Sequence, residues 1–178
     1  AAGKGLHTES LCAKIHRYFS ARNMGFEIHL TTGPQDALQF VQSYPRQKEG
    51  AQICFVACGG DGTLHEVVNG AAKRSDCTVA VIPCGSGNDY VKNFGSADAF
   101  TDLERLVQGA PRPVDLLDCS GEYAVNLCNI GFDARVAHHM SKFKRIPFVS
   151  GPLAYTLSLL FCILGPISST MAISCHGR

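Results

Sequence analysis

The sequence predicts an α/β fold: a parallel sheet with helices on both faces, followed by the start of a second, mainly antiparallel β domain. Two near-continuous apolar runs, residues 53–58 and 78–82, have the pattern of strands buried on both faces. Segments with helical spacing alternate with these runs, which favours parallel strands joined by helices. Further along the chain, two apolar segments joined by Ser120-Gly121 indicate a hairpin.

The first third of the chain predicts a helix, a strand and a second helix. Apolar residues recur every four positions from Leu11 to Phe19, which predicts a helix from about 9 to 23. Residues 26–31 alternate apolar and polar side chains and predict a strand. The second helix is expected to have Pro34 in its first turn, where proline is tolerated, and to end before Pro45.

The middle of the chain predicts three more helices and the two strands of the hairpin. A helix that ends near Ala71 follows the first buried strand. A short helix is expected over 89–94 and a longer one over 99–108. Residues 114–119 and 123–130 then have the apolar character of paired strands.

The end of the chain predicts a second domain. We expect a helix that includes 133–137, an apolar helix over 152–164 and a strand over 170–175. Because the alternation of helices and strands gives way to a hairpin, we place a first domain at 1–112 and an incomplete second domain at 113–178. The chain opens within a glycine-containing stretch, so we also expect that a first strand is missing from it.

The composition excludes several classes of protein. The chain has 178 residues, of which 46% are hydrophobic and 17% charged, a globular rather than a disordered composition. The formal charge of +1 gives no support to nucleic-acid binding, which requires a basic stripe. The nine cysteines include no C-x-x-C pair, so we expect free thiols in a reducing cytosol.

The apolar segment 152–164 raises the question of membrane contact. It is shorter than the roughly 20 apolar residues that a membrane span needs, and Gly165-Pro166 ends it, so we interpret it as a buried helix. Lys142, Lys144 and Arg145 precede it. Such a basic cluster can bind anionic lipid headgroups, although it is more often a solvated helix end. We expect a cytoplasmic protein that is peripheral to the membrane.

Two glycine-rich turns each follow a buried strand and open a helix. They are Gly59-Gly60-Asp61-Gly62-Thr63 and Gly85-Ser86-Gly87. Since the carboxyl ends of parallel strands lie along one edge of a sheet, both turns are expected at a ligand-binding edge. Glycine lets backbone N–H groups approach an anion closely, and the helix dipole adds favourable charge. Gly3-Lys4-Gly5 could supply a third loop, and either turn could instead be only a tight connection.

The standard nucleotide-binding motifs are absent. There is no G-x-x-x-x-G-K-[ST] sequence, and no G-x-G-x-x-G followed by an acid about 20 residues later. A phosphate group would therefore have to be held by a different set of glycine loops. No serine lies in a G-x-S-x-G context, which disfavours a serine hydrolase.

Several polar residues near the turns have two interpretations each. Asp61 could accept a hydroxyl proton or position a metal ion, or it could cap the helix that follows. Asp89 has the same alternatives, with Asn88 as another cap. Thr32 could hydrogen-bond a nucleotide or serve as a helix N-cap. Glu66 could orient a neighbouring group or be a plain surface acid.

The sequence resembles the catalytic domain of the diacylglycerol kinase family, which includes bacterial lipid kinases and sphingosine kinases. The resemblance rests on the motifs at 59–70, 82–89 and 125–134, which follow one another in the family's order. The opening residues 1–5 resemble the end of a glycine loop of that family. Gly-Gly-Asp-Gly-Thr alone is shared with the NAD kinases and the phosphofructokinase-like group.

The resemblance implies an ATP-dependent kinase that uses Mg²⁺ and phosphorylates a lipid hydroxyl, such as that of diacylglycerol. It implies that Asp61 is catalytic, as the aspartate of sphingosine kinases is; in bacterial diacylglycerol kinases the proton acceptor lies in the second domain. Ser86 stands where many members have threonine. The candidate nucleotide-binding residues are Gly3, Gly5, Thr32, Gly59, Gly60, Asp61, Gly62, Thr63, Leu64, His65, Glu66, Gly85, Ser86, Asn88 and Asp89.

Other functions stay open on the sequence alone. An NAD kinase-like or other small-molecule kinase would require a polar acceptor site, which the uncharged stretch 146–175 disfavours. A nucleotide-binding fragment without activity of its own is the alternative outside enzymes. The expected partners are a lipid substrate and, transiently, a membrane surface, and a homodimer is left open.

Overall fold

The computed structural model describes residues 5–47, 52–143 and 151–165, together with isolated positions between 146 and 170. Gly3 lies outside the described residues, as does the predicted strand 170–175 except for its first residue. The chain divides into two compact units, Ala1–Leu127 and Cys128–Arg178. The domains predicted at 1–112 and 113–178 refer to the architecture of the family, and they stay a prediction.

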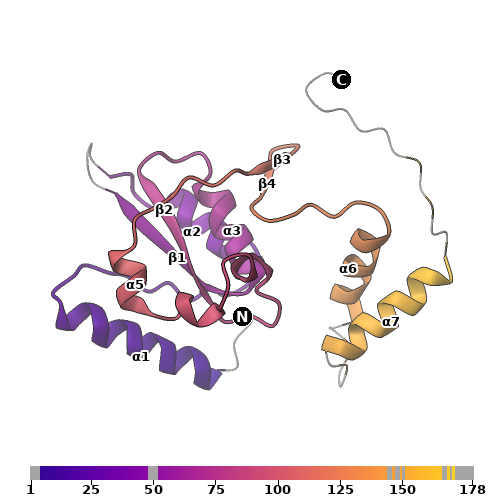
Figure 1. Ribbon diagram of the computed structural model, residues 1–178, viewed down its shortest axis with the longest axis horizontal. Helices are drawn as coiled ribbons and strands as arrows, with labels where there is room; N and C mark the ends of the chain where they lie inside the picture. Colours follow the sequence, from indigo (N-terminus) through magenta and orange to yellow (C-terminus); the bar gives the residue numbers. More distant parts are fainter. Residues whose placement is uncertain are drawn as a thin grey trace. The chain divides into compact units, whose positions relative to one another are not determined.

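The first unit is built on two parallel strands, β1 (Ile53–Gly59) and β2 (Cys77–Pro83). Their register runs from Ile53 opposite Cys77 to Gly59 opposite Pro83, so both strands end at the same level. Figure 1 shows the pair flanked by helices. This confirms the predicted α/β fold and the parallel pairing, and it places the segments after Gly59 and Pro83 at one edge of the sheet.

Helices α2 (Asp36–Ser43) and α3 (Asp61–Ala71) cover one face of these strands. Phe55 of β1 is buried in the same core as residues of both helices. The helices approach each other closely at Gly70, where an added Cβ would lie 2.7 Å from Val41 Cβ. The core of this unit consists of Ala37, Val41, Phe55, Ala57, Leu64, Val67, Val68, Ala71, Val81 and Val91.

The burial of β1 differs from the sequence prediction. Phe55 and Ala57 are buried, but Cys54 and Cys58 on the other face are exposed. The apolar run makes both faces of the strand suitable for burial, whereas α2 and α3 cover only the face that carries Phe55. None of the cysteines in the described part of the chain forms a disulfide.

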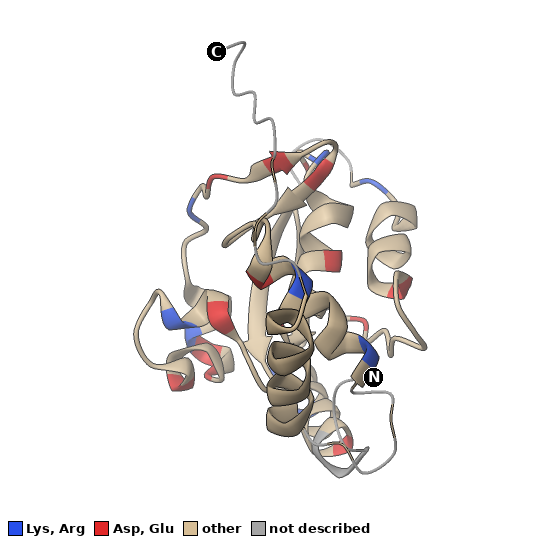
Figure 2. Cartoon of the chain, turned by 90° about the vertical axis from the view of Figure 1, so that its right-hand side faces the viewer, with Lys and Arg blue, Asp and Glu red and all other residues tan. Residues whose placement is uncertain are grey.

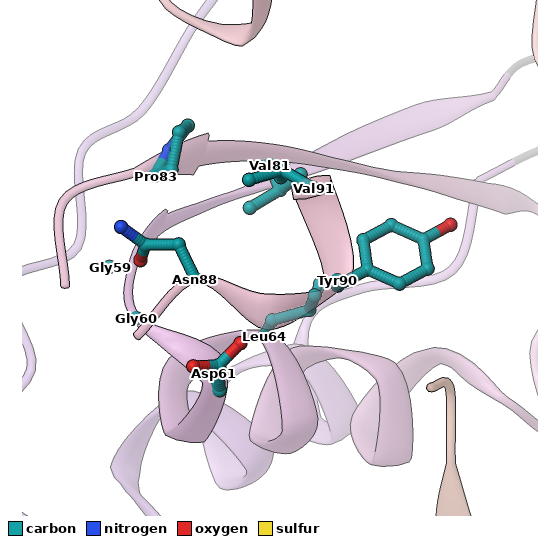
Figure 3. Close-up of a pocket in the computed structure, with 9 residues that line it drawn as sticks. All are labelled: Gly59, Gly60, Asp61, Leu64, Val81, Pro83, Asn88, Tyr90 and Val91. Atoms are coloured by element: carbon teal, nitrogen blue, oxygen red, sulfur yellow. The ribbon is translucent and has the colours of Figure 1, made fainter. Parts of the chain in front are cut away.

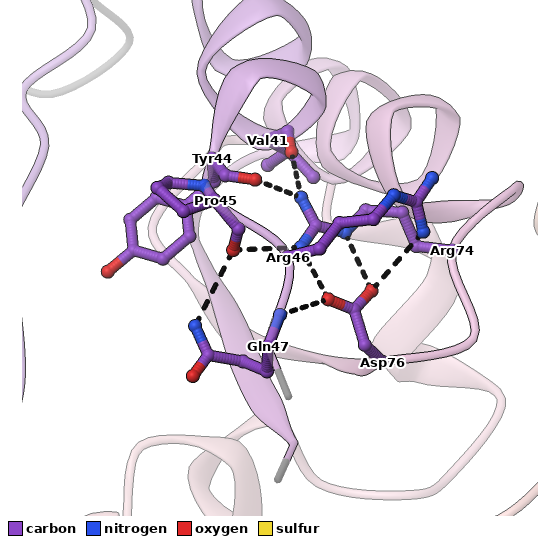
Figure 4. A network of polar contacts seen from close by, with 7 residues as sticks. All are labelled: Val41, Tyr44, Pro45, Arg46, Gln47, Arg74 and Asp76. Carbon is purple, nitrogen blue, oxygen red and sulfur yellow. Dashed lines mark hydrogen bonds and ion pairs between the residues drawn. The ribbon is translucent and has the colours of Figure 1, made fainter. Parts of the chain in front are cut away.

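A buried ion pair fixes the end of α2 beside the start of β2 (Figure 4). Arg74 and Asp76 lie 2.8 Å apart, with side chains 4% and 13% exposed. The Arg74 guanidinium also donates to the carbonyl oxygens of Val41 and Tyr44, at 2.8 and 2.7 Å. Since the last carbonyls of a helix lack intrahelical partners, Arg74 satisfies the C-terminal end of α2.

Helix α1 (Gly5–Ala21) is joined by polar contacts to the segment around α5 (Leu103–Gln108). Tyr18 donates its hydroxyl to Glu104 at 2.9 Å, and Arg22 forms an ion pair with the same carboxylate. The helix ends earlier than predicted. Asn23 adopts a φ of 51°, a left-handed conformation that asparagine tolerates and that stops the helix two residues before Gly25.

The predicted strand at 26–31 is not formed in the described structure. The segment has no regular secondary structure, and Phe26, Ile28 and Leu30 are exposed. A strand requires a hydrogen-bonded neighbour, and within the described residues β1 pairs only with β2. Alternation of side chains therefore identified a strand-like pattern but not a partner for it.

Short elements complete the first unit. The helix predicted over 89–94 is α4 (Asp89–Lys92), and the one predicted over 99–108 is a 3₁₀ turn, Ala97–Phe100, followed by α5. Strands β3 (Leu117–Cys119) and β4 (Glu122–Ala124) form an antiparallel hairpin, as predicted, although each strand is shorter. Ser120 and Gly121 both have positive φ, the geometry of a type I′ turn.

The second unit contains two helices in contact, α6 (Phe132–Phe143) and α7 (Gly151–Ile163). Helix α7 agrees in its bounds with the predicted helix at 152–164, but the interpretation of a buried helix holds for one side only. Ala154, Ser158 and Cys162 are buried, whereas Leu160 and Ile163 are about half exposed. The Ser158 hydroxyl is buried and donates to the carbonyl oxygen of Val136 at 2.5 Å. None of the helices in the described segments has the length and apolar character to cross a bilayer.

Candidate functional site

The two glycine turns meet at the edge of the sheet (Figure 3). The Cys84 amide, at the end of β2, donates to the Gly59 carbonyl at 2.8 Å. A Cβ added to Gly60 would lie 3.1 Å from Gly85 Cα, and one added to Gly85 would collide with Gly60. The backbones therefore touch, and this contact requires glycine at both positions.

Asn88 closes the second turn. Its side-chain oxygen accepts the Gly85 N–H at 3.0 Å, and its side-chain amide donates to the Gly85 carbonyl at 2.7 Å. Asn88 itself is left-handed, with φ 54° and ψ 46°. Asparagine suits this position, because it tolerates the left-handed region and hydrogen-bonds nearby backbone.

Asp61 links the first turn to the helix after the second turn. Its Oδ1 accepts the Asp89 N–H at 2.7 Å, at the start of α4. A Cβ added to Gly87 would lie 2.6 Å from the other Asp61 oxygen, Oδ2, and 3.8 Å from Asp89 Oδ2. The exposed side chain of Asp61 is thus held in place, and two carboxylates flank Gly87. Asp61 thus caps α4; of the two interpretations that the sequence left open, the cap of its own helix is not the contact that it makes.

The N-terminal end of α3 has no side-chain cap. The N-cap residue is Gly60, which has no side chain that could accept a hydrogen bond from the first turn of the helix. The amides of Asp61, Gly62 and Thr63 form the first turn of the helix, where N–H groups lack intrahelical partners. Uncapped amides at a helix N-terminus favour an anion.

Gly62 differs from the other glycines of this turn. An added Cβ on Gly62 would meet nothing within 4 Å, and the residue is exposed. Gly59, in contrast, lies under the Thr63 side chain, where a Cβ would collide. Packing within the chain therefore explains glycine at 59 but not at 62, where glycine also weakens the helix. Absence of a side chain at 62 leaves the α3 amides open to a ligand.

The hollow between the turns is small. It encloses about 170 Å³, including its open mouth, which is less than the roughly 300–1,000 Å³ of typical small-molecule sites. The turns therefore form one wall of a site rather than an enclosed cavity. Tyr90 and Val91, which the sequence prediction missed, contribute to this wall, and their position one turn after the glycines is the signal for them. The lining residues are Gly59, Gly60, Asp61, Leu64, Val81, Pro83, Asn88, Tyr90 and Val91.

Two other candidates hold the start of α2. Glu66 accepts the N–H groups of Gln35 and Ala37 at 2.9 and 3.2 Å, so it caps α2 and fixes the preceding loop against α3. Thr32 donates its amide and its hydroxyl to Asp36 Oδ2 at 2.6 and 2.7 Å. These hydrogen bonds, with a further one from His29, lower the pKa of Asp36 to about 2. The Thr32 hydroxyl is thus already engaged.

The remaining candidates are dispersed. The Leu64 side chain is 4% exposed and belongs to the core. His65 lies 2.8 Å from Glu122 of β4, away from the glycine turns. Ser86 is exposed in the second turn, and Gly5 is the first residue of α1. The structure thus brings together Gly59 to Thr63 with Gly85 to Asp89. Leu64 lines the hollow from the core side, and His65 lies outside this set.

A second, wider hollow of about 700 Å³ lies between α2, α3 and the hairpin. Asn69 joins its walls, because its side chain both donates to and accepts from the Tyr123 backbone at 2.8 Å. The hollow is mainly polar and shares no residue with the glycine turns. Its lining residues are Gln35, Leu38, Gln42, His65, Asn69, Lys73, Gly121, Glu122 and Tyr123.

Few side chains at the glycine turns could bind a metal ion. Among the residues that the structure describes, no cluster of three or more His, Cys, Asp or Glu side chains could hold a metal ion. Asp61 and Asp89 provide two carboxylates beside Gly87. Lys92 forms an ion pair with Asp89 at 2.6 Å, through the oxygen Oδ1.

Comparison with known proteins gives a consistent result. The family model described as "Diacylglycerol kinase catalytic domain" matches residues 1–119. The "Diacylglycerol kinase" of Bacillus subtilis (strain 168) is 35% identical over 165 residues, 88% of this chain and 50% of that protein. A "Probable lipid kinase YegS-like" of Pseudomonas aeruginosa is 33% identical over 105 residues, 58% of this chain and 34% of that protein.

The chain matches only part of each relative. It spans about half the length of the Bacillus protein and about a third of the Pseudomonas protein. No solved structure gives a significant match to it. The activity of the whole protein therefore stays a proposal.

Proposed function

The chain belongs to the diacylglycerol kinase catalytic domain family, and from this premise we propose that it holds Mg-ATP in an enzyme that transfers the γ-phosphate to a lipid hydroxyl. The relatives are named diacylglycerol kinase and lipid kinase. The observation that carries the proposal is the meeting of two glycine turns at the uncapped N-terminus of α3. Because the chain spans about half of the Bacillus protein and about a third of the Pseudomonas protein, the complete reaction is proposed for the intact protein.

Phosphate binding is assigned to the backbone. The N–H groups of Asp61, Gly62 and Thr63 offer hydrogen bonds and the positive end of the α3 dipole to phosphate oxygens. The bare Cα of Gly62 lets those oxygens approach. Contact between Gly60 and Gly85 brings the second turn, with exposed Ser86, to the same place.

A magnesium ion would neutralise charge on the phosphates. Mg²⁺ prefers oxygen ligands, and it is commonly held by one or two carboxylates together with substrate phosphates. The carboxylates of Asp61 and Asp89 fit that description, since both flank Gly87. With the ion bound, their charge would be balanced beside the nucleotide.

Asp61 is also the candidate proton acceptor. Phosphoryl transfer depends mainly on positioning and electrostatic stabilisation, and a carboxylate that accepts the attacking hydroxyl's proton assists it. The hydrogen bond from the Asp89 amide fixes the Asp61 carboxylate next to the proposed phosphate site. The competing assignment places the proton acceptor in the second domain.

The substitution Asp61→Asn in the intact protein tests whether the Asp61 carboxylate takes part in turnover, as base or as magnesium ligand. Asparagine retains an acceptor for the Asp89 amide but is not a base. We expect turnover with Mg-ATP and dispersed diacylglycerol to fall by about 100-fold or more at an unchanged Tm. Asp115→Asn, at an exposed acid outside the site, is the matched control. Near-normal turnover of the Asp61 variant would reject its role as base.

The acceptor class is tested in the same assay. With radiolabelled ATP, diacylglycerol and NAD are offered in parallel and the products are separated. We expect label in the lipid and not in NAD. Label in NAD alone would show that the acceptor is polar and not a lipid. It would not contradict the proposed ATP site.

A further inference from the structure

The two helices that follow the glycine turns hold one short segment, residues 122–126, which we term the anchored segment. The Asn69 side chain of α3 accepts the Tyr123 N–H and donates to the Tyr123 carbonyl oxygen, each at 2.8 Å. At the end of α4, the side-chain amide of Asn93 donates to the side-chain oxygen of Asn126 at 3.0 Å. The anchored segment is thus tied to both α3 and α4.

The middle of the anchored segment packs against the core that also forms the wall of the proposed nucleotide site. Val125 lies against the core of the first unit, and Leu64 and Val91 of that core also line the hollow between the turns. This hollow, of about 170 Å³, is one wall of a site and not an enclosed cavity. Another part of the chain must therefore complete the site, and the anchored segment is already joined to the existing wall.

Asparagine suits position 69 because its side chain makes three hydrogen bonds there. Besides its two hydrogen bonds with Tyr123, the Asn69 side-chain amide donates to the His65 carbonyl oxygen at 2.9 Å, one turn earlier in α3. The side chain thus uses both its donor group and its acceptor. Since the partner groups belong to the backbone, Asn69 fixes the path of the chain at Tyr123 and not merely the position of a side chain.

Charged side chains contribute little to this attachment. Helix α3 and the hairpin 117–124 contain acids, red in Figure 2, but neither Lys nor Arg. His65 and Glu122 lie 2.8 Å apart, but their side chains are 40% and 70% exposed, and solvent-exposed ion pairs add little stability. Asn69 is therefore the main polar link between α3 and the anchored segment.

We propose that Asn69 is a positioning residue for phosphoryl transfer. It lies on the helix whose first turn offers the proposed phosphate-binding amides, about 9 Å along the axis from Thr63 at about 1.5 Å per residue. Through this helix it keeps the anchored segment in register with those amides, and the acceptor hydroxyl is aligned with the γ-phosphate through that segment. A misplacement of about 1 Å can slow a transfer about 100-fold. The inference rests on the proposed function, since it presupposes a phosphoryl acceptor.

Asn69→Ala in the intact protein tests this role by separating turnover from ATP binding. We expect kcat with Mg-ATP and dispersed diacylglycerol to fall by about tenfold or more, because the acceptor is misaligned. The KM for ATP, and the Kd for ATP from calorimetric titration, should stay within about twofold, because the phosphate-binding amides are unchanged. Asn69→Gln, which keeps the amide on a longer side chain, should recover part of the lost kcat. Gln39→Ala, at an exposed amide of α2, is the matched control.

Asn93→Ala removes the other attachment of the anchored segment, at an exposed contact, so it tests the same role if Asn69→Ala does not fold. It too should lower kcat and leave the KM for ATP unchanged. A folded Asn69→Ala protein with the kcat of the unsubstituted protein would overturn the proposal. So would an equal loss of ATP affinity and of kcat, because Asn69 would then act on the ATP site itself. If the unsubstituted protein bound no ATP, that result would instead contradict the proposed function, and this inference with it.

Discussion

Glycine is required for different reasons at positions 60 and 62 of the first turn. At Gly60 the chain needs the space, because Gly85 of the second turn touches it. At Gly62 no other part of the chain occupies the space that a Cβ would fill, and the residue is exposed. A sequence motif shows both as the same letter, and only the packing around each one separates a structural glycine from one that admits a ligand.

The roles of single acids were the least predictable part of the site from sequence. Asp61 was expected to cap its own helix or act chemically, and it caps α4 across the two turns. Glu66 was expected to orient a group or be a surface acid, and it caps α2. Spacing along one helix could not give these contacts, because each partner lies about 30 residues away in the sequence.

At the residue scale, stability in acid should depend on Asp76. Hydrogen bonds from Arg74, first, and from the Gln47 amide hold the pKa of Asp76 well below its usual range. A lowered pKa in the folded state stabilises above the unfolded value of about 3.9, and that stabilisation is lost as the pH falls below it.

The measurement is the Tm as a function of pH for the protein and for Asp76→Asn. We expect the variant to melt at a lower temperature near pH 7 and to lose less Tm than the protein as the pH falls below about 4. Asp115→Asn, at an exposed acid, should follow the unsubstituted protein. Parallel curves for Asp76→Asn and the protein would show that this carboxylate does not govern acid sensitivity.

At the element scale, sequence periodicity located most helices and strands, but it did not show which strands pair or where the helices end. It predicted α2, α3 and the parallel strands, because buried apolar faces dominate those segments. It predicted a strand at 26–31 that the structure does not form, since alternation cannot supply a neighbouring strand. The end of α1 depends on the backbone conformation of Asn23, which no periodicity reveals.

The packing of α2 on α3 should depend on Gly70. An added Cβ would lie 2.7 Å from Val41 Cβ and 3.0 Å from the Leu38 carbonyl oxygen, so Gly70→Ala forces the helices apart. We expect a loss of about 1–3 kcal/mol in the free energy of unfolding, as for other overpacked cores. Denaturant unfolding measures it.

Gly25→Ala is the control for that substitution. A Cβ at Gly25 meets nothing within 4 Å, so the stability of this variant should change little. If the Gly70→Ala protein were as stable as the Gly25→Ala protein, the contact between α2 and α3 would accommodate the added methyl group without loss of stability.

At the scale of the whole molecule, family membership and the geometry of the glycine turns are two separate kinds of support for the proposed nucleotide site. The family model covers residues 1–119, which hold both glycine turns. Both turns also lie in the first compact unit, Ala1–Leu127, so the proposed nucleotide site belongs to that unit alone.

The most direct test of nucleotide binding at the glycine turns is calorimetric titration with ATP and magnesium of the protein, of Gly62→Ala and of the control Gly25→Ala. We predict that Gly62→Ala binds ATP about tenfold more weakly or worse while its Tm is unchanged or slightly raised, because alanine favours a helix but obstructs its open amides. Gly25→Ala should bind as the protein does. Equal ATP affinity for all three proteins, or no binding by any, would contradict the assignment of the glycine turns to a triphosphate.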